Sequence, residues 1–124
     1  MRPYFDGGIV ITKGVDRCLF AFPPEEWSTF KANVKANTNL STRGRQLSRM
    51  FFSMAFEAAL DRQGRVLIPT KLAQYAGLSR DVTLTGVDDR LEIWDTEEWN
   101  RYVSGADESF VEIIEEFAGR DFGV

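Results

Sequence analysis

One segment of the chain occurs twice, and the two copies are separated by a constant interval. Residues 10–27 and 82–99 align at an offset of 72 positions, and 8 of the 18 aligned pairs are identical. The identical pairs are Val10/Val82, Gly14/Gly86, Val15/Val87, Asp16/Asp88, Leu19/Leu91, Glu25/Glu97, Glu26/Glu98 and Trp27/Trp99. Self-similarity at a fixed interval is the mark of repeated supersecondary units. The sequence therefore predicts two related units with a shared order of elements.

The first copy predicts a strand pair followed by a helix. Residues 9–12 and 18–22 are largely apolar runs on either side of a turn at residues 14–17, as in two neighbouring strands. Pro24 suits the first turn of a helix. Apolar side chains then recur on one helical face as far as about Lys35.

The segment that follows predicts a second helix and then a strand. Ser41 is expected to cap a helix that runs through Ser53, because apolar side chains recur there at helical spacing. These side chains are Leu47, Met50, Phe51 and Met54. Alternating apolar residues predict a strand at residues 56–60.

A hairpin and a short helix precede the second copy. Residues 61–64 predict a turn, and Arg65–Ile68 predicts the strand that follows it. Pro69 ends this strand. Residues 70–76 predict a short helix that is closed by Gly77.

The second copy itself leads into helical sequence. Strands are predicted at residues 82–85 and 91–94, and a variant of the capping box at residues 95–98 opens a helix. A break at Ser104–Gly105 is expected to precede a final helix with one apolar face, which indicates a partner such as a neighbouring subunit. The apolar face comprises Phe110, Ile113, Ile114 and Phe117.

Composition excludes several classes of function. The chain has no histidine, which removes Ser-His-Asp and Cys-His catalysis and nearly every zinc site. Its single cysteine, Cys18, lies in an apolar run and is expected to be a core residue of a cytoplasmic protein. No segment approaches the roughly 20 apolar residues that span a membrane. The net charge of −4 argues against a generally basic nucleic-acid surface.

Several motifs in combination resemble the MraZ family of bacterial transcription regulators. They are residues 61–69, Lys71-Leu72-Ala73 and Leu91-Glu92-Ile93-Trp94 in the second unit, and residues 12–20 and Pro24-Glu25-Glu26-Trp27 in the first. The resemblance extends from about Arg2 to Tyr102. It implies a mixed α/β fold, mainly β with short helices, in which AbrB-like swapped-hairpin (double-split β-α-β) units are duplicated and the strands are antiparallel and mixed.

The resemblance also implies a division of the chain into three parts. Residues 1–54 are expected to form the first AbrB-like unit, incomplete at its N-terminus, together with its helical extension. Residues 55–104 are expected to form the second unit, and residues 105–124 a C-terminal amphipathic helix.

Each unit of that family carries a D-x-x-x-R signature that contacts DNA. Here the second signature is Asp61-Arg62-Gln63-Gly64-Arg65, and the resemblance implies that these five residues bind DNA. The first signature has no counterpart, and Arg2-Pro3-Tyr4-Phe5 resembles the end of the short helix that follows it. We therefore expect the chain to begin partway through its first unit, through a misplaced start, trimming or natural variation.

The same five residues also suit a plain hairpin turn. Asp at the first position and Gly at the fourth are preferred in type I turns. The two interpretations are compatible, because a rigid turn can project an arginine toward a ligand. Arg65 can donate two hydrogen bonds to guanine, whereas Arg62 suits a phosphate and Asp61 can brace an arginine.

Other charged positions allow simpler interpretations. Arg43, Arg45 and Arg49 form either a solvated helix face or a secondary phosphate-binding surface. Acidic pairs such as Glu25-Glu26 and Asp88-Asp89 lie at helix starts and turns, which accounts for most of them without a metal ion.

The resemblance implies a DNA-binding transcriptional regulator and not an enzyme. It would act in the cytoplasm, associated with the nucleoid, as a ring-like homo-oligomer on direct repeats in double-stranded promoter DNA of division and cell-wall genes. No cofactor, metal, membrane or small-molecule substrate is expected. The competing hypothesis is a protein-interaction or assembly module that has lost DNA binding together with its first D-x-x-G-R turn.

Overall fold

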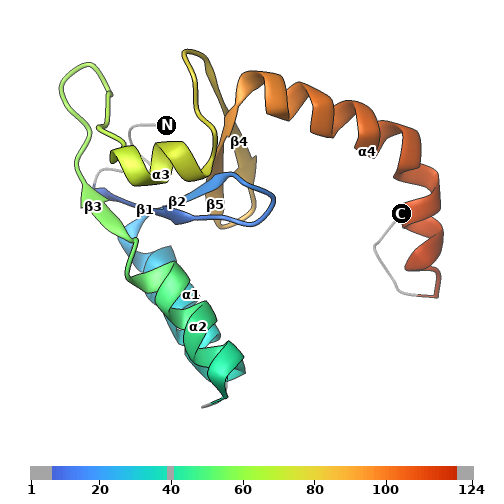
Figure 1. Cartoon of the computed structure of the whole chain (residues 1–124), viewed down its shortest axis with the longest axis horizontal. Helices are drawn as coiled ribbons and strands as arrows, with labels where there is room; N and C mark the ends of the chain where they lie inside the picture. Colours follow the sequence, from blue (N-terminus) through green and yellow to red (C-terminus); the bar gives the residue numbers. More distant parts are fainter. Residues whose placement is uncertain (1–6, 39–40, 120–124) are drawn as a thin grey trace.

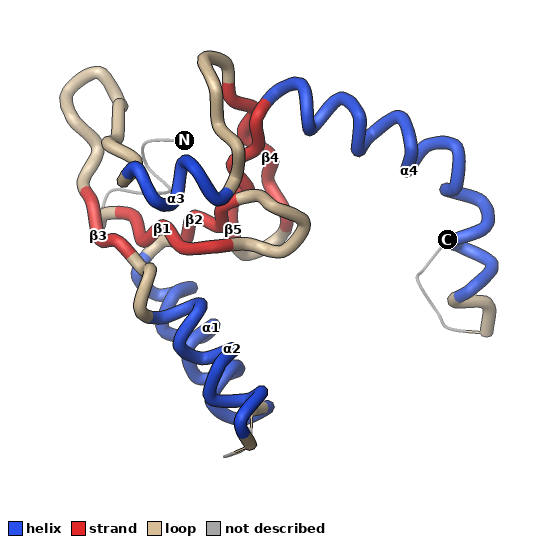
Figure 2. Tube along the Cα trace, in the orientation of Figure 1, coloured by secondary structure: helices blue, strands red, loops and turns tan. Residues whose placement is uncertain are grey.

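The computed structural model describes residues 7–38 and 41–119, and the strands in this part form a single sheet in the order β3-β1-β2-β5-β4. The strands are β1 (Ile9–Lys13), β2 (Leu19–Phe22), β3 (Phe56–Ala58), β4 (Val82–Val87) and β5 (Arg90–Asp95). The helices are α1 (Pro24–Asn37), α2 (Thr42–Phe52), α3 (Thr70–Tyr75) and α4 (Thr96–Glu116). Helices α1 and α2 lie on one side of the sheet and α3 on the other, while α4 extends away from it (Figure 1, Figure 2). The predicted mixed α/β class is confirmed.

The two copies of the repeat form two hairpins that meet in the middle of the sheet. Strand β1 pairs with β2, β4 pairs with β5, and β2 pairs with β5 so that Phe20 lies opposite Glu92. Phe20 and Glu92 are equivalent positions of the repeat. The 72-residue offset also relates Leu19 to Leu91 and Ala21 to Ile93, so the flanking pairs Leu19↔Ile93 and Ala21↔Leu91 are equivalent to each other. The sheet therefore has an internal pseudo-twofold axis at this pair. Every pairing among the described strands is antiparallel rather than partly mixed.

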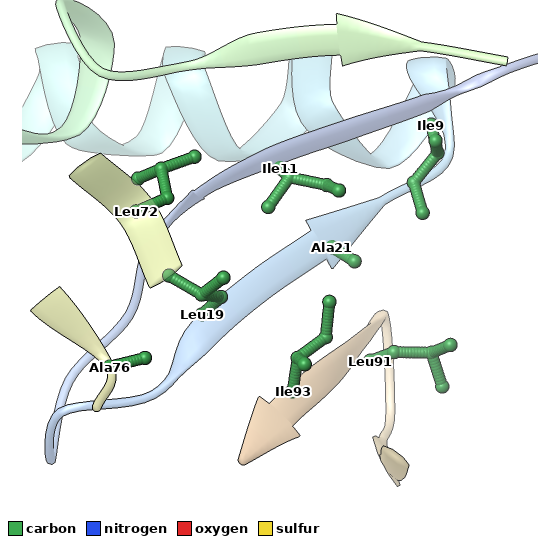
Figure 3. Packing of buried hydrophobic residues seen from close by; sticks show 8 residues of the cluster. All are labelled: Ile9, Ile11, Leu19, Ala21, Leu72, Ala76, Leu91 and Ile93. Atoms are coloured by element: carbon green, nitrogen blue, oxygen red, sulfur yellow. The ribbon is translucent and has the colours of Figure 1, made fainter. Parts of the chain in front are cut away.

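Buried side chains cover both faces of the sheet, because successive residues of a strand point to opposite faces. The cluster beneath α3 comprises Ile9, Ile11, Leu19, Ala21, Leu72, Ala76, Leu91 and Ile93 (Figure 3). The cluster on the opposite face comprises Val10, Cys18, Phe20, Phe22, Trp27 and Trp94. These two clusters hold the sheet between α3 and the α1–α2 pair, and the sheet in turn positions the loops.

Local signals predicted the starts of α1 and α2 and the end of α3 correctly. Pro24 occupies the first turn of α1, as expected. The Ser41 hydroxyl accepts a hydrogen bond from the Gly44 amide at 3.0 Å and so caps α2. Gly77 follows α3 with a φ of 62°, the left-handed conformation that commonly closes a helix.

The predicted strand at Arg65–Ile68 is wrong. This segment has no regular secondary structure and is not part of the five-stranded sheet. Its side chains nevertheless alternate as in a strand: Val66 and Ile68 pack against the cluster beneath α3, whereas Leu67 is 77% exposed. The alternation therefore results from burial of one side of the segment and not from pairing with another strand.

The expected helix break at Ser104–Gly105 is also wrong, because α4 continues through both residues. A glycine inside a helix costs about 1 kcal/mol relative to alanine, which is too little to end a helix with favourable turns on both sides. The division of the chain into units at residues 54 and 104 stays a prediction. Residues 2–5, 39 and 120–124, on which parts of the sequence interpretation fall, lie outside the described residues.

Asp95 joins β5 to α4 and caps the helix, as predicted. Its carboxylate accepts hydrogen bonds from the Ser79 hydroxyl at 2.6 Å, the Ser79 amide at 3.1 Å and the Glu98 amide at 3.4 Å. These hydrogen bonds, and above all that of the Ser79 hydroxyl, hold the pKa of Asp95 below its ordinary value of 3.8.

We expect the stabilising effect of Asp95 to depend on pH. A pKa that is depressed by folding stabilises the native state above the unfolded-state pKa, and this stabilisation is lost as the pH falls through the folded-state value. Asp95→Asn should therefore lower the free energy of unfolding at neutral pH, and its difference from wild type should shrink below pH 3.8. Urea unfolding at several pH values measures this difference, with Asp81→Asn, at an exposed position just before β4, as the control. A difference that stays constant with pH would contradict the assignment.

Candidate nucleic-acid interface

Residues 61–65 form a loop between β3 and α3 that is closed by backbone hydrogen bonds. The Asp61 amide donates to the Arg65 carbonyl at 2.9 Å, and the Gly64 amide donates to the Asp61 carbonyl at 2.9 Å. Gly64 has a φ of 79°, which glycine adopts without strain. A tight turn followed by a left-handed residue is a common geometry for three-residue hairpin loops. The predicted turn at residues 61–64 is confirmed.

The Asp61 carboxylate organises the inside of this loop. Its Oδ1 accepts hydrogen bonds from the amides of Gln63 at 2.9 Å and Arg65 at 2.8 Å. Its Oδ2 accepts a hydrogen bond from Arg65 Nε at 2.8 Å. One carboxylate therefore holds two backbone amides and one guanidinium, so Asp61 acts as an internal brace of the loop.

Arg65 is oriented by the loop but remains accessible. Its side chain is 76% exposed, and its Nη2 donates to Gln63 Oε1 at 3.3 Å. An exposed ion pair contributes only about 0–1 kcal/mol to stability, so the contact with Asp61 acts mainly on geometry. A guanidinium has five N–H donors, which leaves capacity beyond these two contacts. Arg62 and Gln63 are exposed in the same loop.

The loop stands on a base that is packed into the core. Leu60 on one side and Val66 and Ile68 on the other pack against the cluster beneath α3. The loop between β3 and α3 rises on the α3 side of the sheet, opposite α1 and α2 (Figure 1). A rigid base with a projecting polar tip is suited to contact an extended ligand such as a nucleic-acid duplex.

The arginines of α2 do not belong to the same surface. Arg43, Arg45 and Arg49 are exposed on α2, which lies on the side of the sheet away from the loop (Figure 2). The structure thus separates these two groups of arginines, which were both candidates for DNA contact. A role of the α2 arginines as phosphate contacts stays a prediction.

A cavity of about 300 Å³ lies near the C-terminal end of α3, where the sequence indicated none. Its lining includes Asp16, Arg17, Ala76, Gly77 and Glu98. The Tyr75 hydroxyl donates to the Gly14 carbonyl at 2.7 Å and holds the turn at residues 14–17 against α3. Because the cavity combines three segments that are distant in the sequence, no local motif marks it.

Cys18 is a structural residue. Its thiol is buried and donates to the Val15 carbonyl at 2.8 Å. Burial, with smaller effects of the nearby Glu92 and Asp16, raises the pKa of the Cys18 thiol to about 12, so the reactive thiolate is scarce at neutral pH.

Two further findings concern metals and membranes. Among residues 7–38 and 41–119, no three His, Cys, Asp or Glu side chains are grouped so that they could hold a metal ion. In the same part of the chain, no helix combines the length and the apolar character needed to cross a membrane.

Comparison with known proteins identifies the family. Residues 51–121 match the family model described as "MraZ protein, putative antitoxin-like". Two curated relatives, from Frankia alni and Frankia casuarinae, are each named Transcriptional regulator MraZ. They are 44% and 42% identical to this chain over 115 residues, which cover 93% of the chain and 80% of each relative. The fold and the site define an α/β protein with an exposed arginine loop. The matches to the family model and to both relatives show that the chain belongs to the MraZ family.

Proposed function

We propose that this chain is a transcriptional regulator that binds double-stranded DNA through the loop at residues 61–65. The curated relatives are named transcriptional regulators, which is a non-enzymatic role. The observation that carries the DNA contact is the braced loop, which exposes Arg62, Gln63 and Arg65 above a packed base. Since the net charge is −4, DNA contact is confined to such local groups, and non-specific affinity stays low.

Within the loop, the arginines have different roles. Arg65, oriented by Asp61 and Gln63, reads a guanine through two hydrogen bonds in the major groove. Arg62 contacts a phosphate and helps to position the loop without reading the sequence.

One loop per chain binds DNA weakly, so the functional particle is an assembly. Several loops on a ring-like homo-oligomer act at high effective concentration when their spacing matches direct repeats in a promoter. By its family resemblance, the regulator acts on promoters of division and cell-wall genes in the cytoplasm, in association with the nucleoid.

Arg65→Ala should weaken binding to promoter DNA that contains direct repeats. Loss of a bidentate guanine contact of about 1–3 kcal/mol corresponds to about 5- to 150-fold in affinity for each engaged loop. Electrophoretic mobility shift with the full chain measures the effect. Arg101→Ala is the matched control, because Arg101 is also exposed, at 67%, and also forms a local ion pair, with Glu98; its affinity should equal that of wild type.

The same assay separates the two arginines of the loop. Arg62→Ala should weaken binding to promoter and unrelated DNA alike and reduce the salt dependence of the affinity. If Arg65→Ala shifts promoter DNA as well as wild type does, the loop is not the site of base recognition. If neither protein shifts DNA, the interaction or assembly module is the better account of the chain.

A further inference from the structure

The outer part of α4 presents an apolar stripe to solvent. Phe110, Ile113 and Ile114 are 60%, 41% and 43% exposed, and their spacing of three and four residues places them on one helical face. At the start of the same helix, Trp99 and Tyr102 pack against Trp94 with ring centroids 5.3 and 5.1 Å from it. Beyond this attachment α4 extends away from the sheet (Figure 1). The stripe is therefore presented at a distance from the core of its own chain.

Helix α2 carries a shallow groove on its exposed face. The groove has a volume of about 300 Å³ and is lined by Arg43, Gln46, Leu47 and Met50. Leu47 and Met50 are 46% and 43% exposed. At about 1.5 Å per residue, α2 and the part of α4 at residues 105–116 are each about 16–18 Å long. Both surfaces thus have apolar side chains along a helix of matching length.

The two helices carry opposite charge. Helix α2 contains three arginines and no acidic residue, for a charge of +3. Residues 105–116 of α4 contain five acidic residues and no basic one, for a charge of −5: Asp107, Glu108, Glu112, Glu115 and Glu116. Asp107 lies beside the apolar stripe, about 60° from Phe110 around the helix, whereas Glu108 and Glu112 lie about 160° from Phe110. The opposite net charges of the two helices favour their encounter, whereas like charges oppose pairing of α4 with α4 or of α2 with α2.

We propose that the apolar stripe of α4 binds the α2 groove of a second copy of this chain. The α1–α2 pair and the outer part of α4 extend from the sheet in different directions (Figure 1), so the two surfaces of one chain do not meet. The contact joins two different surfaces and is therefore head-to-tail, and such a contact closes into a ring when the rotation between copies permits. The inference rests on the proposed homo-oligomer and names the surfaces that build it. It also gives Arg43 a role in protein contact rather than in phosphate binding.

Replacing the apolar centre of either surface with a charge tests the contact. Phe110→Asp and Leu47→Asp should each reduce the particle mass of the full chain at least twofold, as measured without DNA by native mass spectrometry. Val111→Asp is the matched control: Val111 is 67% exposed and lies about 100° from Phe110 around the helix, so this variant should keep the wild-type mass. Because all three positions are exposed, circular dichroism should show unchanged helix content. A wild-type mass for Phe110→Asp or Leu47→Asp would overturn the inference, as would a control that dissociates to the same extent.

Charge reversal tests the pairing of the two helices independently. Arg43→Glu, in the groove, should reduce the particle mass, whereas Arg45→Glu, about 160° away on the same helix, should not. Asp107→Lys, about 60° from Phe110 around α4, should also reduce the mass, and Arg43→Glu combined with Asp107→Lys in one chain should restore it. If Arg43→Glu and Arg45→Glu instead weaken DNA binding equally at unchanged mass, α2 is a phosphate-binding surface and the inference fails.

The outcomes separate this inference from the function proposed above. A wild-type chain that is monomeric at every concentration tested would overturn the inference and the homo-oligomer, but not the DNA contact of Arg65. An oligomer that survives all the variants would overturn the inference alone.

Discussion

Phe22→Ala is expected to lower the free energy of unfolding by about 3–5 kcal/mol. Phe22 is fully buried in β2, and its ring centroid lies 4.8 Å from that of Phe30 and 5.6 Å from that of Trp27. Removing the ring leaves a cavity between the sheet and α1. The neighbouring rings are themselves packed and cannot collapse into it without losing other contacts, so the cost of the cavity adds to the lost burial.

Denaturant unfolding measures this effect, with Leu67→Ala as the matched control. Leu67 is also apolar but 77% exposed, so its truncation should change stability by no more than about 0.5 kcal/mol. For Phe22→Ala the melting temperature should fall by on the order of 10–20 °C. Equal losses in the two variants would show that burial in this cluster does not determine stability.

Gly14→Ala is expected to destabilise the chain by about 1–3 kcal/mol through overpacking. An added Cβ would lie 2.8 Å from Phe20 Cδ1 and 2.9 Å from Cys18 Sγ, closer than such atoms approach in folded proteins. Phe20 has little room to move, because its ring packs edge-on against those of Phe22 and Phe30. The guanidinium of Arg90 also lies 4.4 Å from its centroid.

The repeat supplies the control for this substitution. Gly86 is the equivalent of Gly14, but a Cβ added there would meet Leu91 Cδ2 at 3.9 Å, an ordinary contact. Gly86→Ala should therefore leave the free energy of unfolding within about 0.5 kcal/mol of wild type. Chemical denaturation of both variants compares the two sites, and equal stability would mean that the packing around Phe20 adjusts to the added methyl group.

The parts of the fold that could be predicted from the sequence are those specified by neighbouring residues. The proline at the start of α1, the Ser41 cap of α2 and the Asp95 cap of α4 each act within about one helical turn. The turn at residues 61–64 is of the same kind, because aspartate at its first position and glycine at its fourth are preferred there whatever the rest of the chain does. Family resemblance then marked this turn as the candidate DNA-binding site.

Other features of the site could not be predicted because they depend on distant parts of the chain. The alternation of Val66, Leu67 and Ile68 indicated a strand, but it arises from packing of one side against the cluster beneath α3. The separation of the loop from the arginines of α2 depends on which side of the sheet each segment occupies. Neither property can be read from residue spacing, because both are set by contacts between remote segments.

The sequence by itself determined the repeat, most of the elements and their ends, and the turn that presents Arg65. The tertiary structure alone decided that the two hairpins join through β2 and β5, with Phe20 opposite its repeat equivalent Glu92. It also decided that α2 and the outer part of α4 present exposed apolar faces in different directions. The physical reason is that caps and turns are stabilised by hydrogen bonds between near neighbours, whereas strand order and exposed faces follow from burying apolar surface contributed by the whole chain.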